Sequence, residues 1–243
     1  MPVSDPYYLA QHAYACVTNG QVVLLDIRRQ KYIGLGRVSS ALLAHYVVGW
    51  PLMDGDGAME LKSGDGRRHT TVTKMHRMGL ITRDPAQAHT ATQRITTPAA
   101  RTLVPADLEK RPIVKWGFGF RILQACMAAA WDLRLCRFEH VVSRLQARKT
   151  ERSVTAAGCD QQSLFDVVER YVYARPLFFA ARDACRYDSR TLLELLYYHR
   201  IFPTWVFGVH TEPFQAHCWL QLGDLVVNDA VENVSRFTPI LAI

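Results

Sequence analysis

The sequence has few of the features that mark secreted, metal-binding or membrane-spanning proteins. Its six cysteines are scattered and form neither a C-x-x-C pair nor a tight Cys/His cluster, which argues against a structural zinc site and a small disulfide scaffold. No run of about 18 apolar residues occurs, so no transmembrane helix is expected. The opening residues lack the basic head and apolar run of a signal peptide. These absences predict a cytoplasmic protein with free cysteines, without a metal and without membrane insertion.

A phosphate-binding loop of the form G-x-x-x-x-G-K-[ST] is also lacking, and we expect no cofactor. Acidic residues number 22 against 29 basic ones, which gives a formal net charge of +7. This balance suits nucleic acid, an anionic surface or an acidic partner, but solubility alone explains it equally well. Within residues 133–152, apolar side chains recur at helical spacing with arginines between them. We expect one amphipathic helix with a basic, solvated outer face, and a docking surface is the alternative.

Short strands dominate the beginning of the chain. Strand-forming runs cover residues 13–18, 22–27 and 32–35, and Asn19-Gly20 supplies a favoured two-residue hairpin turn between the first two. After these strands the period of the pattern becomes helical. The first 83 residues therefore predict a compact, winged-helix-like α+β domain.

Two short helices complete this predicted domain. Ser39 or Ser40 is expected to cap the first helix, which Gly49 and Pro51 end. The second helix spans roughly residues 71–78 and stops at Gly79, before a short strand.

Periodicity is lost over residues 84–112, where prolines punctuate a stretch rich in Thr, Ala and Gln. This composition predicts an interdomain linker. Residues 113–243 then begin with helices, through about Tyr173, and finish with strands at 204–210, 214–222 and 225–229. Helices followed by antiparallel strands predict a second α+β domain.

Cys185 is the first residue with a pattern that suggests chemistry. Asp183 is expected to cap a helix over residues 184–200, which places Cys185 in its first turn. There the helix dipole and the free N–H groups favour the thiolate over the thiol. A buried structural cysteine fits the same position, because Cys185, Ser189 and Leu192 share one helical face. Helix position alone therefore assigns no catalytic role.

His217 and Asp229 supply the missing partners. If Leu222-Gly223-Asp224 forms a three-residue hairpin loop, Gln221 pairs with Leu225 and His217 lies directly opposite Asp229. The Asp then accepts from one imidazole nitrogen and leaves the other for a thiolate. A two-residue loop would break this register, and a core histidine beside a solvent-facing Asp is the alternative.

The order of a Cys at a helix start, a His on a strand and an Asp on the next strand favours a nucleophilic site. In this site Cys185 is the nucleophile, His217 the base and Asp229 the orienting residue. Cys218 is expected to point to the opposite face of its strand and to pack in the core. The other histidines lack the spacing of metal ligands and are expected at the surface.

The C-terminal 60 residues or so resemble the B proteins of lasso-peptide biosynthesis, in the transglutaminase-like branch of papain-type folds. The resemblance lies in these segments: Cys185, Asp188-Ser189, Leu192-Leu193, Phe202–Val209, Pro213-Phe214, Ala216–Trp219 and Asn228-Asp229. Two positions depart from the family, which usually has apolar residues where this chain has Arg186 and Arg190.

The resemblance implies a leader peptidase that uses a Cys185–His217–Asp229 triad and hands the core peptide to a separate, ATP-using, asparagine-synthetase-like cyclase. Residues 1–83 resemble the PqqD-like leader-recognition domain, in which the leader of the precursor peptide adds beside the third strand and lies against the last helix. The corresponding leader-binding positions are Lys31, Tyr32, Ile33, Lys74, Met75 and Met78.

The sequence thus predicts an α+β chain: an N-terminal winged-helix-like, PqqD-type domain followed by a papain/transglutaminase-like cysteine protease domain. Two other functions stay open. The same triad suits acyl transfer to an amine, as in transglutaminases. A non-catalytic winged-helix adaptor or nucleic-acid binder is the second, suggested by the basic residues 73–77, although we expect no nucleic-acid partner.

Overall fold

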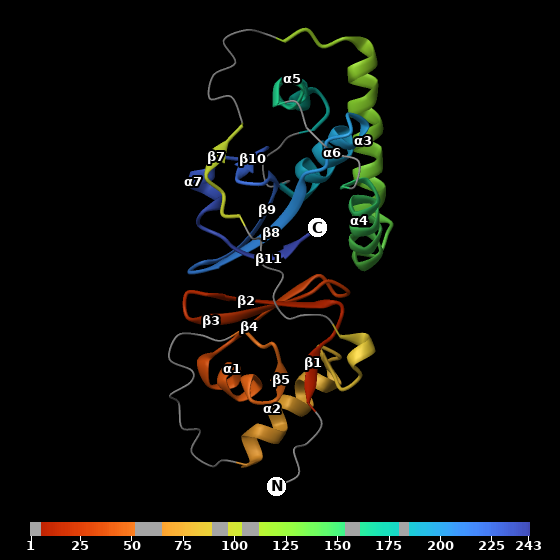
Figure 1. Cartoon of the computed structure of the whole chain (residues 1–243). Helices are drawn as coiled ribbons and strands as arrows, with labels where there is room; N and C mark the ends of the chain where they lie inside the picture. Colours follow the sequence, from red (N-terminus) through yellow and green to blue (C-terminus); the bar gives the residue numbers. More distant parts are fainter. Residues whose placement is uncertain (1–5, 52–64, 89–96, 104–111, 154–160, 180–184) are drawn as a thin grey trace. The chain divides into compact units, whose positions relative to one another are not determined.

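The computed structural model describes residues 6–51, 65–88, 97–103, 112–153, 161–179 and 185–243. The chain forms two compact units, one of Met1–Arg94 with Val209–Gln215 and Thr238–Leu241, and one of Ile95–Gly208 with Ala216–Phe237 and Ala242–Ile243 (Figure 1). Both units mix helices and strands, as the α+β prediction requires.

The first unit contains the predicted three-stranded antiparallel sheet, in the order β2-β3-β4. Its strands are β2 (Ala13–Thr18), β3 (Gln21–Asp26) and β4 (Lys31–Leu35). Asn19 and Gly20 both have positive φ, 46° and 69°, between the paired residues Thr18 and Gln21. Two central residues with positive φ match the twist of the flanking strands. The hairpin prediction is therefore confirmed.

A second small sheet and two helices pack beside this hairpin. Strand β1 (Tyr7–Leu9) pairs in parallel with β5 (Val47–Val48) and antiparallel with β6 (Ile81–Thr82). The helices are α1 (Arg37–Ala44) and α2 (Asp65–Arg77).

The predicted ends of these helices differ from the structure. Helix α1 has Gly36 as its N-cap, without a side-chain hydrogen bond, so neither Ser39 nor Ser40 is its cap. Ser40 is instead buried and accepts a hydrogen bond from the indole nitrogen of Trp50 at 3.1 Å. Helix α2 begins about two turns before the expected Thr71, but Gly79 follows its end with a φ of 73°, as expected of a C-terminal glycine.

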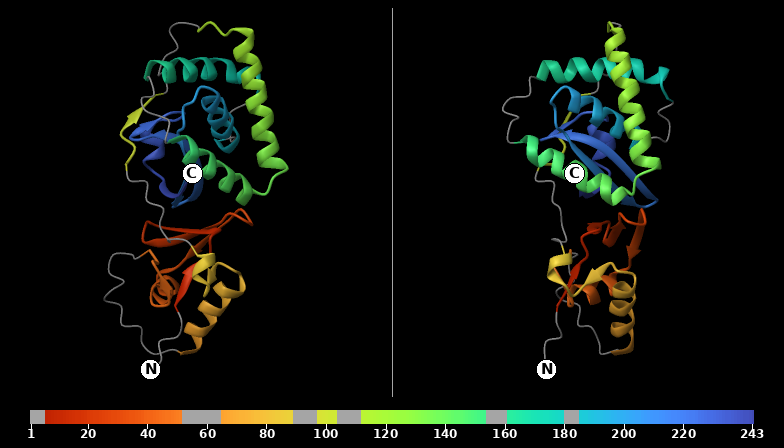
Figure 2. Two further views of the ribbon diagram at one scale, coloured as in Figure 1. Left: turned by 45° about the vertical axis from the view of Figure 1, so that its right-hand side comes forward. Right: turned by 90° about the vertical axis from the view of Figure 1, so that its right-hand side faces the viewer.

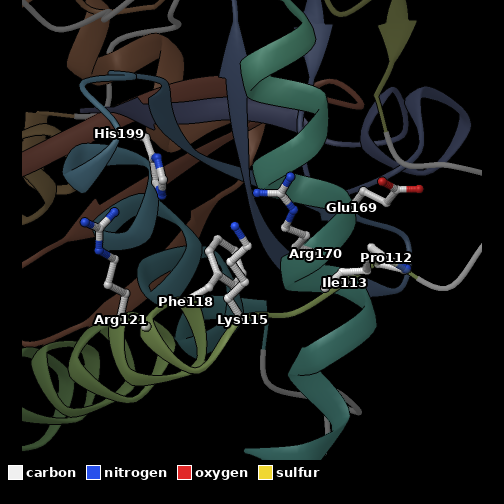
Figure 3. A pocket seen from close by; sticks show the side chains of 9 residues that line it. Pro112, Ile113, Lys115, Phe118, Arg121, Glu169, Arg170 and His199 are labelled. Carbon is white, nitrogen blue, oxygen red and sulfur yellow. The ribbon is translucent and has the colours of Figure 1, made fainter.

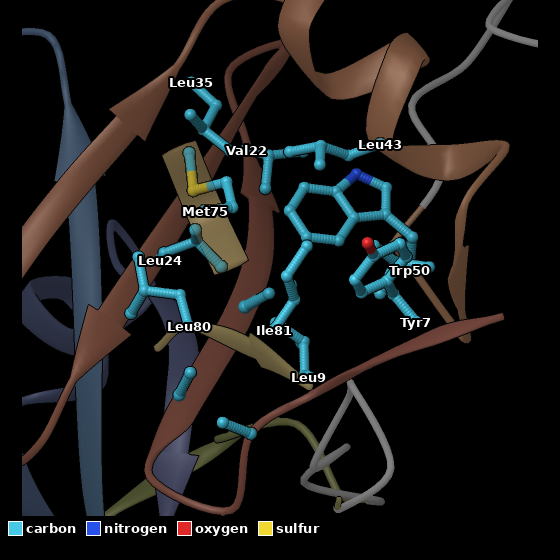
Figure 4. Packing of buried hydrophobic residues seen from close by; sticks show 14 of the residues in the cluster. Tyr7, Leu9, Val22, Leu24, Leu35, Leu43, Trp50, Met75, Leu80 and Ile81 are labelled. Carbon is cyan, nitrogen blue, oxygen red and sulfur yellow. The ribbon is translucent and has the colours of Figure 1, made fainter. Parts of the chain in front are cut away.

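The core of the first unit lies between the sheets and the two helices. Figure 4 shows the indole ring of Trp50 lying among Leu43, Ile81 and Tyr7. Met75, from α2, is 4% exposed in the same cluster. Apolar side chains from both sheets and both helices thus meet in one cluster, which burial of apolar surface stabilises.

The segment predicted as a linker, 84–112, contains ordered elements. A short 3-10 helix, η2 (Pro85–Gln87), is capped by Asp84 and accepts a backbone hydrogen bond from Gln11 of the first unit. Strand β7 (Arg101–Thr102) pairs in parallel with β10 (Leu225–Val226) of the second unit. The described parts of the segment therefore belong to one unit or the other.

Helices surround a five-stranded sheet of order β11-β8-β9-β10-β7, most of which belongs to the second unit (Figure 2). The remaining strands are β8 (Thr204–Thr211), β9 (Phe214–Leu222) and β11 (Thr238–Ala242). The helices are α3 (Trp116–Arg134), α4 (Phe138–Ser153), α5 (Gln161–Ala174), η3 (Arg175–Leu177), α6 (Cys185–Tyr198) and α7 (Val231–Val234).

Helix α6 lies between α3 and the strands (Figure 1). The helix predicted over residues 133–152 is present as α4, but it begins only at Phe138, because α3 continues to Arg134 and a break separates the two helices. Strand β10 is also shorter than the predicted 225–229. In the described ranges, no helix has the length and apolar character needed to cross a membrane.

Candidate active site

Cys185 is the first residue of α6, at the end of the helix where backbone N–H groups are unpaired. The side chain is half-buried. One turn later, the Ser189 hydroxyl donates to the Cys185 carbonyl at 2.6 Å and accepts from the indole nitrogen of Trp205, on β8, at 2.8 Å. The beginning of α6 is therefore fixed to the sheet by buried hydrogen bonds, which gives the thiol a defined position.

His217 and Asp229 are in direct contact. The Nε2 atom of His217 lies 2.5 Å from Oδ2 of Asp229. Asn233, from α7, donates to both carboxylate oxygens at 3.1 and 3.0 Å, and the Ala230 N–H donates at 2.7 Å. Burial raises the pKa of Asp229, but the hydrogen bonds from His217, Ala230 and Asn233 outweigh burial and leave the pKa below its ordinary value. The carboxylate is thus held ionised against the imidazole.

The predicted hairpin register, which placed His217 opposite Asp229, is wrong. The loop has two residues, Gly223 and Asp224, with Leu222 paired to Leu225 and Gln221 to Val226 rather than to Leu225. The ladder then ends early, because the Asn228 side chain accepts the hydrogen bond of the Leu220 N–H at 2.8 Å.

The chain leaves the sheet at this point, so Asp229 reaches His217 from the segment between β10 and α7 instead of from an opposed strand position. Asp224, the other acid near the turn, binds the guanidinium of Arg101 at 2.9 and 2.7 Å. Asp229 is therefore the acid beside the imidazole.

Cys185 and His217 form a charged pair. With Nε2 held by Asp229, the remaining ring nitrogen is left for Cys185. A hydrogen bond from the Cys218 thiol makes the largest contribution to lowering the pKa of Cys185, whereas burial raises this pKa. The hydrogen bond and the positive charge of His217 lower it further, to about 4. Burial lowers the pKa of His217, but Asp229 and Cys185 outweigh burial and raise it to about 9. Between these values thiolate and imidazolium coexist.

Cys218 is a neighbour of the nucleophile that the sequence prediction missed. Its side chain does point away from the face of His217 into the core, as expected, but this core includes the beginning of α6. The Cys218 Sγ atom lies 3.4 Å from the Ser189 hydroxyl, and the interaction of its thiol with Cys185 lowers the pKa of Cys185. Burial holds the pKa of Cys218 well above its usual value. Cys218 therefore stays protonated and donates to the Cys185 thiolate.

Aromatic rings support His217. The Trp219 ring centroid lies 6.1 Å from that of the imidazole at an interplanar angle of 20°, and the Phe237 centroid lies at 5.2 Å. Gly208, on β8, makes room for both rings, because a Cβ atom there would come within 2.8 Å of Phe237 Cβ and 2.9 Å of the Trp219 ring. The glycine is thus required by a close approach, and any side chain would displace the rings that position the base.

A buried polar network connects α6 to the segment that carries Asp229. The Asp188 carboxylate accepts from the Tyr171 hydroxyl at 2.8 Å, from Arg175 at 3.1 Å and from the Asn228 side chain at 3.4 Å. Since Asn228 also terminates the ladder, this network fixes both the nucleophile helix and the turn before Asp229. Tyr171 and Arg175 were not identified from the sequence, where neither belongs to a recognisable motif.

Arg190, which departs from the family pattern, lies in a buried ionic cluster. It is 2% exposed and donates to Asp132 of α3 at 2.9 and 2.6 Å and to Glu194 at 2.9 Å. Arg144 and Arg148 of α4 bind the same two acids, Arg144 to Asp132 and Arg148 to Glu194 at 3.1 Å. These two arginines were predicted on a solvated face but pair with buried carboxylates. Removal of one partner would leave an unpaired buried charge, at a cost of roughly 3–5 kcal/mol.

Arg186, the second departure, lies closer to the site. Its guanidinium is 5.8 Å from the centroid of the Phe138 ring. A cation over an aromatic face is stabilising, and the long side chain keeps its apolar stem against the helix. The apolar family positions are thus occupied here by arginines with specific partners.

The predicted leader-binding residues lie on or beside two elements of the first unit, β4 and α2. Lys31, Tyr32 and Ile33 are on β4, an outer strand of its sheet. Lys74 is exposed on α2, and Met78 directly follows this helix. Ile33 and Met78 pack against one core cluster from its margin. Met75 is buried in this core, so its side chain packs the domain and does not offer a binding surface.

Metal ligation finds no support in the described ranges, where no group of three or more His, Cys, Asp or Glu side chains could hold an ion.

A cavity of about 720 Å³ lies apart from the triad. It is lined by the beginning of α3, by α5 and by His199, which directly follows α6 (Figure 3). Because α6 has 14 residues, this cavity lies about 20 Å along the helix from Cys185. It is therefore separate from the Cys185–His217–Asp229 site.

Residues 123–242 match the family model of the transglutaminase-like superfamily. The C-terminal half of the chain therefore carries a transglutaminase-like core domain, and all three residues of the candidate site lie within it. No curated protein and no solved structure matches the chain significantly.

Proposed function

We propose that the protein is a cysteine leader peptidase of lasso-peptide biosynthesis. The observation that carries the peptidase assignment is the arrangement of Cys185, His217 and Asp229, in which an ionised thiol at a helix N-terminus faces an imidazolium held by a carboxylate. Such a triad cleaves acyl compounds through a covalent thioester. The lasso assignment rests on the resemblance of the segments around the triad to B proteins.

The acylation step follows from the charges of the pair. The Cys185 thiolate attacks the carbonyl carbon of the peptide bond between leader and core, and the carbonyl oxygen becomes an oxyanion. The backbone N–H of Cys185 is one expected donor to this oxyanion. His217 then transfers its proton to the core nitrogen as the C–N bond breaks, so the core leaves as a free amine and the leader remains as a thioester.

Hydrolysis of the thioester completes the reaction. The now neutral His217 accepts a proton from water, the hydroxide attacks the thioester carbonyl, and the C–S bond breaks to restore the thiolate and the imidazolium. Asp229 keeps the imidazole in one orientation through both steps. The core, with its new N-terminus, passes to the asparagine-synthetase-like cyclase.

The first unit is proposed to bind the leader. An extended peptide can add to the outer edge of β4 through backbone hydrogen bonds, beside Lys31, Tyr32 and Ile33 and against Lys74 and Met78 of the α2 end. Met75 contributes by packing the core beneath this surface.

This binding mode predicts a pattern in the leader. In an added strand, alternate residues direct their N–H groups to the partner strand. We therefore expect single Pro substitutions in the leader to weaken binding strongly at every second position, because Pro has no N–H to donate. Ala at the same positions, the matched control, should have smaller effects. Titration of labelled leader peptides against the full chain measures both series. A response to Pro without a two-residue period would contradict strand addition.

Product analysis tests the proposed reaction itself. We expect mass spectrometry of a lasso precursor from the same genome, mixed with the full chain, to show a free leader carboxylate and a core with a free N-terminus. If an added amine is joined to the leader in preference to water, the enzyme is an acyl transferase. If the precursor stays intact and the chain binds generic duplex DNA with strong salt dependence, the adaptor or nucleic-acid binder is correct instead.

A further inference from the structure

Large apolar side chains are exposed along the outer side of α3. Five of them, at i, i+4, i+7, i+11 and i+15, form what we call the α3 ridge: Trp116 (97% exposed), Phe120 (60%), Leu123 (44%), Met127 (56%) and Trp131 (60%). The inward side of the same helix is also apolar and is buried, with Phe118, Ile122, Ala125 and Ala129. The helix is thus apolar on two sides, and only one of them is covered by its own domain.

An apolar surface of this extent is unusual on a soluble protein. Fully buried Trp and Phe side chains each remove about 150–250 Å² from water, and three such residues lie on the ridge. Contiguous exposed patches larger than a few hundred Å² mark interaction sites. Packing within the second unit does not require these side chains, so the ridge points to a binding partner.

The charges beside the ridge restrict the kind of partner. Lys115, Arg121 and Arg134 are exposed at or within the bounds of α3. The single acid in this helix, Asp132, is buried and bound to Arg190 and Arg144. A row of apolar side chains flanked by cations complements an apolar surface that carries negative charge.

The cavity at the beginning of α3 has the same polarity. Lys115 and Arg121 of this end meet Arg170 of α5 and His199 there, and Figure 3 shows Glu169 turning its carboxylate away from these cations. Arg170 also makes a 3.4 Å contact with Asp166, one turn earlier in α5. The Nε2 atom of His199 is buried and has no hydrogen-bond partner. Burial lowers the pKa of His199, and the charges of Arg121 and Arg170 lower it further. The cavity thus adds to the positive charge at the beginning of α3.

We propose that the α3 ridge docks this domain on an anionic phospholipid surface, with Lys115, Arg121 and Arg134 meeting the lipid headgroups. Docking of this kind needs no spanning helix, because the apolar side of a helix enters the interface while its cations meet the headgroups. Trp116 and Trp131 lie about 22 Å apart along the helix axis, and Trp is the side chain that the membrane–water interface favours.

A second copy of the chain fits the ridge less well. An isologous dimer through α3 would bring Lys115, Arg121 and Arg134 of each copy toward the same cations of the other, and like charges across an interface repel. A lipid surface satisfies the apolar and the cationic features together.

Vesicle binding of the full chain tests the proposal. We expect the protein to co-sediment with vesicles of equal parts phosphatidylglycerol and phosphatidylcholine, less so as salt is raised, and not with phosphatidylcholine alone. The double variant Trp116→Ser/Trp131→Ser should bind at least about tenfold more weakly, as should Lys115→Gln/Arg121→Gln. Leu177→Ser is the matched control, because Leu177 is 84% exposed but belongs to η3 and not to the ridge, and it should bind like wild type.

Three results would overturn the proposal. The first is equal binding to neutral vesicles, and the second is a Trp116→Ser/Trp131→Ser variant that binds as wild type does. The third is a wild-type dimer in sedimentation that this variant converts to monomers while neither protein binds vesicles, which would make the ridge a protein interface. Unchanged thermal unfolding of the variants shows that lost binding does not come from lost structure.

Discussion

Replacement of Cys185 by Ala is expected to abolish release of the core peptide. The proposed reaction has no other nucleophile, and loss of a catalytic nucleophile in a comparable triad lowers kcat on the order of 10⁶-fold. The half-buried position at the start of α6 makes the structural cost small, at about 1 kcal/mol or less. Mass spectrometry of the precursor after incubation measures the loss, and leader titration and thermal unfolding show whether binding and fold persist.

Cys218→Ala is the matched control for this substitution. It also removes a thiol, but one that donates to the nucleophile instead of attacking the substrate. Loss of that hydrogen bond should raise the pKa of Cys185, so the acid limb of the activity profile should move to higher pH while cleavage continues. If Cys185→Ala still released core at a comparable rate while Cys218→Ala did not, the nucleophile would be Cys218.

The types of the candidate site residues could be predicted from the sequence, but the path of the chain between them could not. Alternation in β9 identified the face of His217, and the helical pattern placed Cys185 at the start of α6. The hairpin register failed because the loop has two residues instead of three, and the ladder then ends early because the Asn228 side chain replaces a backbone acceptor for the Leu220 N–H. The pattern of apolar residues does not show whether a side chain or a backbone carbonyl will accept the hydrogen bond of a given N–H.

Ionic partners far apart in sequence were the other features that escaped prediction. Arg190 and Asp132 are separated by 58 residues, and Arg148 and Glu194 by 46. Cations at helical spacing resemble a solvated surface until the buried acids opposite them are known. The break between α3 and α4 was missed for a related reason, since neither Gly nor Pro lies between Arg134 and Phe138.

Asp229→Asn is expected to lower the rate on the order of 10⁴-fold, the effect of the equivalent change in a Ser-His-Asp triad. The amide keeps the shape of the carboxylate but carries no charge, and it favours the wrong imidazole tautomer. Folding and leader binding should persist, because Asn233 and the Ala230 N–H can still donate to the amide oxygen.

The pH profile of the Asp229→Asn variant separates this role from a structural one. In the wild type, activity needs Cys185 deprotonated, above about pH 4, and His217 protonated, below about pH 9. Without the carboxylate, the burial of His217 is no longer outweighed by Asp229, so its pKa falls and the alkaline limb moves to lower pH. The imidazolium form of His217, now less stable, also stabilises the thiolate less, so the pKa of Cys185 rises and the acid limb moves to higher pH. The measurable window of kcat/KM should therefore narrow from both sides. Asp224→Asn, which changes an acid bound to Arg101 in the same turn region, should leave both limbs in place. Equal losses in the two variants, or a wild-type alkaline limb in Asp229→Asn, would show that Asp229 does not set the charge of His217.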